Sequence, residues 1–350
     1  MPFSEINYQN RAVGILQKAV KNERIAHAYL FAGSKGAGKL ETARLFAQAV
    51  NCEEVADDSC GVCKNCDMTH RSMDPEKVIH PDIVHLVPGK WIGEDGRKQS
   101  SNTIVIGAVR QLCASLYSAP LQAKWRIVIV HDADTMQIQA QNAFLKTLEE
   151  PQEKLKTLFI LISSRPLKLL STIRSRCQTV VFGSVSPRFI KDKILAETEC
   201  DSERTSQIVA YAAGDVNLAM KIAKGESKFG DELLEEREQW LRLWSETVVN
   251  KGNFSTLVNE FGRSRNQLQS FLTLLLSWHR DLLVVKNRGN TELISNVDLL
   301  NLLNTEAETV TEKQILHRME RIIGVLDGVE LYIRGDLALE SMFGEIYLGL

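Results

Sequence analysis

The stretch GSKGAGKLETAR, which begins at Gly33, has the spacing of a loop that binds phosphate groups. Gly33, Gly38 and Lys39 match the pattern G-x4-G-K, in which backbone N–H groups surround the phosphates and the lysine contacts them. Gly36 lies inside the same loop and is included among the predicted nucleotide-binding residues. The next residue is Leu40, whereas such loops carry a Ser or Thr whose hydroxyl holds magnesium. The pattern therefore predicts a P-loop and leaves open whether ATP or ADP is bound.

A second group of polar residues follows the apolar run RIVIV. Hydrolysis of ATP needs magnesium and a group that orients water, and the end of such a strand is where these are expected. Asp132 could hold the metal, but Ala133 stands where a hydrolytic protein carries Glu. We expect Asp134 to point elsewhere on an extended chain and His131 to be a strand-end residue rather than a base. The pattern thus predicts a P-loop that is poorly equipped to hydrolyse ATP.

Four cysteines, Cys52, Cys60, Cys63 and Cys66, form a C-x7-C-x2-C-x2-C array. Four thiolates satisfy tetrahedral zinc without leaving a position for water, so the array predicts a structural zinc site rather than a catalytic one. The alternative is a loop of reduced thiols. Three further cysteines are expected to be packed thiols: Cys113, Cys177 and Cys200. Three histidines lie near the array but are not needed as zinc ligands, because four cysteines already complete the set: His70, His80 and His85.

The segment STIRSRC places Arg176 just before the last apolar run of the first half. An arginine at the edge of a P-loop domain can reach the γ-phosphate of a nucleotide held by a neighbouring subunit. The alternative is that Arg176 pairs with a local carboxylate, as surface arginines commonly do.

Apolar runs alternate with helical segments in the first half of the chain, which predicts an α/β fold with a parallel sheet covered by helices. The runs are AYLFAG (28–33), RIVIVHDAD (126–134), TLFILISS (157–164) and QTVVFG (178–183). Between the second and third runs, QIQAQNAFLKTLEEP predicts a helix that ends before Pro151. The Gly- and Ser-rich segment 89–103 predicts an exposed loop.

Helical periodicity replaces the strands after GSVSP (183–187). A short helical segment is predicted at about 188–225 and a longer all-helical region from about 228. The most apolar stretch, NQLQSFLTLLLSWH, is shorter than the roughly 20 residues that span a bilayer and predicts a buried helix.

The composition is that of an ordinary globular protein of two or three domains, with 350 residues, 44% hydrophobic and 25% charged. The net charge of -2 argues against nucleic-acid binding by bulk electrostatics alone. The first residues, MPFSEINYQN, do not have the pattern of a secretion signal, and clustered cysteines suit a reducing compartment. We therefore expect a cytoplasmic protein without membrane contact.

The motifs taken in order resemble the bacterial DNA polymerase III clamp-loader subunits of the AAA+ class. The sequence AHAYLFAGSKGAGK (26–39) resembles the family's P-loop region, LLSTIRSRC (169–177) resembles its arginine-finger motif, and HPDIVHL and NAFLKTLEEP occur between them. The specific motifs cover residues 1 to about 225, and the remaining helices fit in kind only. The resemblance implies a RecA-like AAA+ P-loop domain (1–183) with a zinc insertion (52–66), a small helical lid (184–226) and an all-helical collar (227–350).

Three departures from the family's ATP-hydrolysing motor subunits all indicate a loss of hydrolysis. Motor subunits carry Ser or Thr after the P-loop lysine, an acid pair at the strand end and an arginine in the lid. This chain has Leu40, Asp132 followed by Ala133, and Asn217 at these places. Ser164, or its neighbour Ser163, falls where the family carries a phosphate-sensing Thr. The resemblance is therefore closest to the delta-prime type, which keeps the fold, the zinc module and the SRC motif without its own hydrolysis.

The resemblance also implies partners. Arg176 would act on the ATP of an adjacent motor subunit, in a pentameric ring with motor and delta subunits that sets a sliding clamp on primed DNA. Two alternatives stay open, namely an active AAA+ motor subunit and a zinc-dependent module that binds single-stranded DNA. The second is the weaker one, because the charge is near neutral and aromatic and basic residues do not alternate around the cysteines.

Overall fold

Two compact units, Met1–Ser184 and Val185–Leu350, divide the chain. The computed structural model describes residues 3, 6–75, 77, 79–91, 102–149, 155–226, 230–249, 254–289, 293–330 and 334–348. Most of the predicted loop at 89–103 lies outside the described residues.

The first unit contains a parallel five-stranded sheet in the order β2-β3-β4-β1-β5. Its strands are β1 (Ala28–Ala32), β2 (Ile83–Leu86), β3 (Arg126–Val130), β4 (Thr157–Ser163) and β5 (Gln178–Val181). The prediction of a parallel α/β sheet is confirmed. The strand β2 was not predicted, because four residues are too few to show a period.

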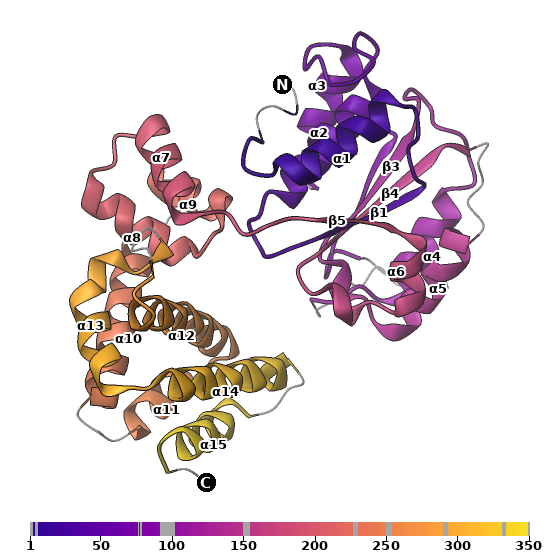
Figure 1. Cartoon of the computed structure of the whole chain (residues 1–350). Coiled ribbons are helices and arrows are strands. Elements are labelled where there is room, and N and C mark those ends of the chain that lie inside the picture. Colours follow the sequence, from indigo (N-terminus) through magenta and orange to yellow (C-terminus); the bar gives the residue numbers. More distant parts are fainter. Residues whose placement is uncertain are drawn as a thin grey trace. The chain divides into compact units, whose positions relative to one another are not determined.

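Helices cover both faces of this sheet, with α1, α2 and α3 on one side and α4, α5 and α6 on the other (Figure 1). Their bounds are α1 (Asn10–Lys21), α2 (Lys39–Asn51), α3 (Lys64–Arg71), α4 (Ile106–Ser115), α5 (Ile138–Glu149) and α6 (Ser171–Arg176). Two short 3-10 turns, η2 (Ala133–Thr135) and η4 (Pro166–Lys168), follow β3 and β4.

Alternate residues of the central strands supply the two apolar layers of the first unit. On β1, Tyr29 and Phe31 pack in the layer under α1 and α2, whereas Ala28 and Leu30 pack in the layer under α4 and α5. All five residues of β1 are buried, as expected for a strand covered on both faces. The sheet therefore holds the loops at its two ends in fixed positions.

The second unit is helical. Its elements are α7 (Pro187–Glu197), α8 (Ser202–Ala212), α9 (Val216–Ala223), α10 (Gly230–Val249), α11 (Ser255–Phe261), α12 (Arg265–Lys286), η6 (Val297–Leu299), α13 (Leu300–Thr309), α14 (Glu312–Glu330) and α15 (Gly335–Leu348). Contacts join α8 to both α10 and η6. The further division into a lid and a collar stays a prediction.

Short polar side chains begin several of these helices. Ser186, Asp201, Asp215 and Ser264 each accept a hydrogen bond from a backbone N–H in the first turn of α7, α8, α9 and α12. The core of this unit is built around α12, whose Phe271, Leu275 and Trp278 are fully buried. None of the helices in the described part of the chain is long and apolar enough to cross a membrane.

Candidate functional site

The P-loop joins the carboxyl end of β1 to the first residue of α2. Its glycines are required by close contacts, since a Cβ on Gly33 would lie 2.6 Å from the carbonyl oxygen of Phe182. Gly38 has a φ of 82°, and a Cβ there would lie 2.5 Å from the hydroxyl of Tyr8. Gly36 also has a positive φ of 69°. Gly36 and Gly38 thus have a backbone conformation that favours glycine. Gly33 and Gly38 leave no room for a side chain.

Lys39 is turned onto its own loop. Its Nζ donates hydrogen bonds to the carbonyl oxygens of Gly33 at 2.7 Å and Ser34 at 2.5 Å, and the residue is only 6% exposed. The next residue, Leu40, packs against the apolar layer under α1 and α2. A hydrocarbon side chain therefore occupies the position from which a hydroxyl would hold magnesium.

A glutamine that sequence reasoning missed ties the P-loop to the segment after the neighbouring edge strand β5. The Nε2 of Gln9 donates to the carbonyl oxygens of Ala37 at 3.0 Å and Gly183 at 2.8 Å. Its Oε1 accepts from the N–H of Gly183 at 3.1 Å. Residues 174 positions apart in the sequence make this contact, so no local pattern could have predicted it.

The residues after β3 differ from the expected extended chain. Asp132 has a φ of 40°, so the backbone turns there, and its side chain is exposed. The turn brings the buried Asp134 to the end of β4, where its Oδ1 accepts from the Ser163 hydroxyl at 2.7 Å and the Ser164 N–H at 3.1 Å. Asp134 thus points in another direction than the exposed Asp132, as expected, but it does so through a turn of the backbone and not along an extended chain. Burial acts to raise the pKa of Asp134, but the bonds from Ser163 and from Arg165 at 3.2 Å hold it below its usual value.

Ala133 belongs to the apolar layer under α5 and is fully buried. A glutamate at this position would have to enter the core, so position 133 is not the place of a missing catalytic acid. Ala133 therefore gives no evidence against hydrolysis, contrary to the expectation, whereas Leu40 still stands where a hydroxyl would hold magnesium. The third predicted departure, Asn217, is exposed on α9.

His131 is paired with another histidine. Its Nε2 lies 2.8 Å from Nδ1 of His85, and Nε2 of His85 lies 2.8 Å from the carbonyl oxygen of Ser72. Because a carbonyl only accepts, His85 donates from Nε2 and accepts from His131 through Nδ1. Burial lowers the pKa of His131 to about 4. A neutral histidine engaged in this way fits the prediction of a strand-end residue.

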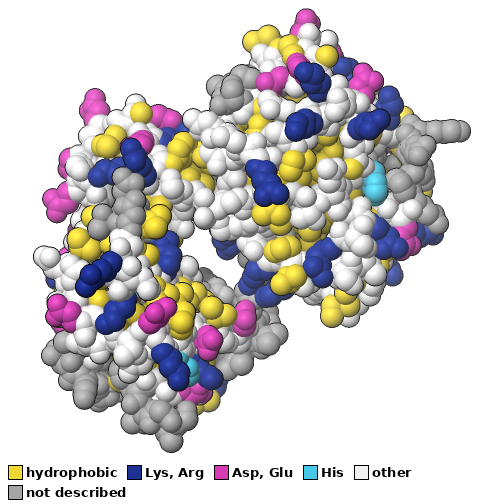
Figure 2. Space-filling model, viewed as in Figure 1, with side chains coloured by type: hydrophobic (Ala, Val, Ile, Leu, Met, Phe, Trp, Pro, Cys, Tyr) yellow, Lys and Arg dark blue, Asp and Glu magenta, His cyan; other side chains and the backbone are white. Residues whose placement is uncertain are grey.

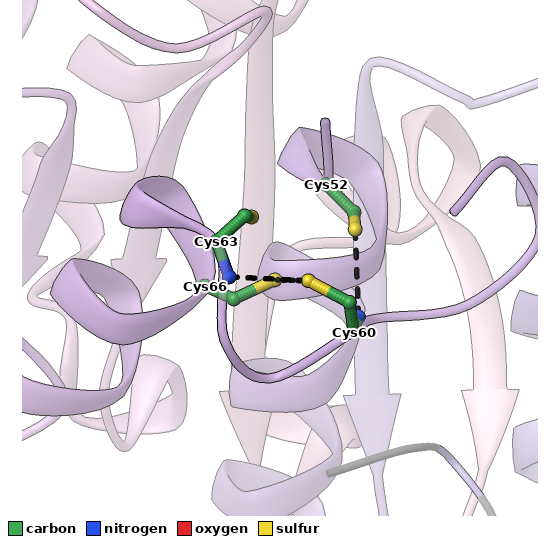
Figure 3. A group of neighbouring side chains, drawn as sticks. All are labelled: Cys52, Cys60, Cys63 and Cys66. Carbon is green, nitrogen blue, oxygen red and sulfur yellow. Dashed lines mark hydrogen bonds between the residues drawn. The ribbon is translucent and has the colours of Figure 1, made fainter. Parts of the chain in front are cut away.

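The four cysteines of the array come together at the start of α3. Their sulfur atoms all lie within 4.8 Å of one another, and the Sγ atoms of Cys60 and Cys66 point at each other at 3.9 Å (Figure 3). Tetrahedral zinc with bonds of about 2.3 Å separates its sulfur ligands by about 3.8 Å. The donor set and its spacing fit zinc, and the predicted grouping of these residues is confirmed.

Backbone N–H groups surround the sulfurs. Cys60 N–H donates to Sγ of Cys52 at 3.4 Å, and Cys63 N–H donates to Sγ of Cys60 at 3.2 Å. Burial acts to raise the pKa of Cys60, but the N–H groups of Cys63 and Val62 outweigh it and lower the pKa to about 7. Burial raises the pKa of Cys66. The N–H donors favour the thiolate form that binds metal.

The cysteine module is fastened to the rest of the unit through α2 and through the HPD motif. Gln48 of α2 donates to the carbonyl oxygen of Cys66 at 2.7 Å. His80 lies 3.0 Å from Oδ1 of Asn65 on α3, and the Asp82 carboxylate accepts three backbone N–H groups of residues 121–123 at 2.7–2.9 Å. His70 lies 2.6 Å from Nη1 of Arg44. The three nearby histidines thus have structural partners, outside the group of four sulfurs.

Arg176 is the last residue of α6 and is partly exposed. Its Nη2 lies 2.7 Å from Oε1 of Glu149 at the end of α5, and its Nη1 donates to the carbonyl oxygen of Thr172 at 2.9 Å. The local carboxylate named as the alternative partner is therefore present. Both side chains of the pair are exposed enough that the pair is weak and can open.

A parallel sheet in the order β2-β3-β4-β1-β5, with a P-loop between β1 and α2 and a helical unit after it, defines an AAA+ protein. The family described as "DNA polymerase III, delta subunit" matches residues 8–186, and the chain belongs to this family. The match covers half of the chain and nearly all of the first unit.

Two relatives come from Bacillus subtilis. DNA polymerase III subunit delta' is 28% identical over 326 residues, which cover 92% of this chain and 91% of the relative. DNA polymerase III subunit tau is 30% identical over 246 residues, which cover 68% of this chain but only 40% of the relative. The chain thus matches delta' over nearly its full length and spans less than half of tau.

A solved structure is also similar. A DNA polymerase III gamma subunit-related protein from Thermotoga maritima is 18% identical with a TM-score of 0.39, covering 95% of this chain and 98% of that protein.

Proposed function

We propose that this chain is a delta-prime type subunit of the DNA polymerase III clamp loader that does not hydrolyse ATP itself. The observation that carries the proposal is the match to subunit delta' of B. subtilis over 92% of this chain and 91% of the relative. A match of this extent includes most of the helical unit, whereas the P-loop motifs lie in the first unit.

The chemistry of the P-loop supports the absence of hydrolysis. Leu40 packs against the apolar layer under α1 and α2 at the position where a magnesium-holding hydroxyl is needed, and Lys39 bonds to carbonyl oxygens of its own loop. These contacts favour a P-loop that supports the fold, with Gly33, Gly36, Gly38, Lys39, Asp132 and Ser164 as the residues that would face a nucleotide. An active motor subunit is disfavoured on the same grounds.

Arg176 supplies the active contribution of the subunit in this proposal. The guanidinium would leave Glu149 when a neighbouring subunit brings its ATP to this edge, and would stabilise the charge that develops on the transferred phosphoryl group. A γ-phosphate carries more charge than one carboxylate, so the exchange of partners is favourable.

Zinc held by Cys52, Cys60, Cys63 and Cys66 would fix the module against α2 as a structural ion. With four thiolate ligands there is no open position for water, so zinc adds stability and no reaction. The module shares α2 with the P-loop, since Gln48 of that helix bonds Cys66 and Lys39 begins it.

The second unit would supply the lid (184–226) and the collar (227–350) through which the chain joins motor and delta subunits in a ring of five. The ring would act on the sliding clamp and primed DNA as an assembly. On the face shown in Figure 2, Lys and Arg side chains are dispersed among apolar and acidic ones, which fits contact with DNA through the assembly better than through this chain alone.

The test is reconstitution with the clamp-loader motor and delta subunits of the same organism. We expect the full chain to elute with them as one complex by size exclusion and to be required for clamp loading on primed DNA. A chain that forms no complex with these subunits, or that hydrolyses ATP alone at the rate of a motor subunit, would contradict the proposal.

A further inference from the structure

A cavity of about 470 Å³ opens at the end of the sheet opposite the P-loop. The segments before β1 and before β4 line it, and so do the facing sides of α4 and α5. The P-loop follows the carboxyl end of β1, whereas this pocket lies at the amino ends of β1 and β4. The volume lies in the range of pockets that hold small organic ligands, and the pocket has no part in the proposed function.

The walls of the pocket combine apolar and aromatic side chains with polar ones. Ile25, Leu116, Trp125 and Phe159 contribute hydrocarbon and ring surface, and Tyr117 stands at the opening with 72% of its surface exposed. Such walls favour a ligand with an apolar body, because binding removes the apolar surface of that body from water.

The charged side chains among the described lining residues of the pocket are Lys146 and Lys156. These lining residues include neither Asp nor Glu. Neither ammonium group makes an ion pair or hydrogen bond with the residues that the structure describes. Two cations over apolar walls, in a chain whose net charge is -2, favour an anionic ligand.

One of the lining residues, His27, carries a buried polar atom. Its Nε2 is buried without a hydrogen-bond partner in the described part of the chain. Buried polar atoms are usually hydrogen-bonded, and those that are not require an explanation. Because this atom has no exposed surface, a ligand in the pocket would not reach it, and the two lysines remain the groups that would contact an acidic group.

We propose that this pocket binds a small organic anion with an aromatic body, whose acidic group contacts the ammonium groups of Lys146 and Lys156. The ring system lies against Trp125 and Phe159, and the acidic group lies at the opening, where it keeps part of its hydration. The proposal is independent of the role of Arg176 and of the cysteine cluster.

The test uses two dyes that share one ring system and differ in charge. Anilinonaphthalene sulfonate carries an acidic group, and N-phenylnaphthylamine is its neutral counterpart. Fluorescence titration of the full-length chain at neutral pH is expected to show one saturable site for the sulfonate, with the neutral dye bound on the order of tenfold more weakly. Equal affinity for both dyes, or no saturable binding of the sulfonate, would overturn the proposal.

Two variants locate the binding. The double substitution Lys146→Met and Lys156→Met keeps the aliphatic stems and is expected to weaken binding of the sulfonate about tenfold while leaving the neutral dye unchanged. Ala143→Phe fills the cavity from α5 and is expected to abolish binding of both dyes. The matched control is Lys221→Met with Lys313→Met, which removes two exposed lysines of the helical unit.

If Ala143→Phe does not fold, nuclear magnetic resonance of the wild-type chain locates the binding site instead. Resonances of Trp125 and Thr147 are then expected to shift on addition of the sulfonate to the wild-type chain, while those of the P-loop stay in place. Binding unaffected by the double lysine substitution, or shifts confined to other regions, would show that the pocket is not the site.

Discussion

The guanidinium of Arg176 lies 2.7 Å from the carboxylate of Glu149, so the proposed finger rests on a partner within its own subunit. In a reconstituted clamp loader, Arg176→Ala is expected to leave the assembly intact and to lower ATP turnover at one interface. A finger of this kind contributes roughly 10³–10⁵ in rate at its site, so clamp loading should slow strongly. Steady-state ATPase and clamp-loading assays measure both effects.

Glu149→Gln is the companion change. It removes the competing charge while it keeps the shape of the side chain, so we expect ATP turnover equal to or above that of the wild type. The matched control is Arg71→Ala, which breaks a surface ion pair with Asp67 in the cysteine module. If Arg176→Ala turns over ATP and loads clamps at the wild-type rate, Arg176 is only a surface charge.

The second prediction concerns the P-loop. The isolated chain is expected to hydrolyse ATP negligibly, and Leu40→Thr alone is not expected to restore turnover. A hydroxyl at position 40 would supply one magnesium ligand, but Asn217 would still stand where the motor subunits are expected to carry an arginine. Phosphate release by the purified variant, compared with a motor subunit, measures this. Motor-like turnover in either the wild type or the variant would contradict the proposed absence of hydrolysis.

The third prediction is one zinc ion per chain, measured by metal analysis of protein purified without chelators. Cys63→Ser is expected to lose the metal and to expose the amide protons of α3 to hydrogen exchange, because Cys63 begins that helix. The strands and the helical unit should keep their protection. Cys200→Ser, a cysteine outside the cluster, is the control and should retain the metal. Zinc-free wild-type protein with an intact α3 would refute the structural role.

Periodicity and apolar runs were sufficient to predict most of the fold. The buried strands β1, β3 and β4 are continuous apolar segments, and α5 shows its buried face in Ala140, Phe144 and Leu148. The grouping of the cysteines was predictable because their spacing is local.

Contacts between distant segments were not predictable. The bond of Gln9 to Gly183 and the pair of Glu149 with Arg176 depend on how the sheet brings separate segments together. The position of Asp134 depends on a left-handed conformation at Asp132, which a non-glycine residue adopts only rarely. The sequence identifies residues whose side chains can bind or react, but it does not show which of these side chains come into contact in the fold.

The last prediction concerns the pH dependence of the helical unit. His279 on α12 is fully buried, and its Nδ1 donates to the carbonyl oxygen of Leu275 at 2.7 Å. The Trp244 ring on α10 lies 5.5 Å away, and Arg318 on α14, which pairs with Glu306 on α13 at 3.1 Å, adds a positive charge nearby. Burial, with a further contribution from Arg318, lowers the pKa of His279 to about 3.

The sign of the effect follows from proton uptake. Below a pH of about 6.5 the unfolded chain binds a proton at this histidine that the folded chain does not bind, so stability falls as the pH falls toward 3. His279→Phe removes this uptake and keeps an apolar ring beside Trp244. Between pH 7 and 5, the free energy of unfolding of the variant should therefore fall by about 2 kcal/mol less than that of the wild type. Urea unfolding followed by tryptophan fluorescence measures the difference, and His317→Phe, at a half-buried position of α14, is the control. Equal pH dependence in His279→Phe and the wild type would show that His279 is protonated in the folded chain, against the burial described.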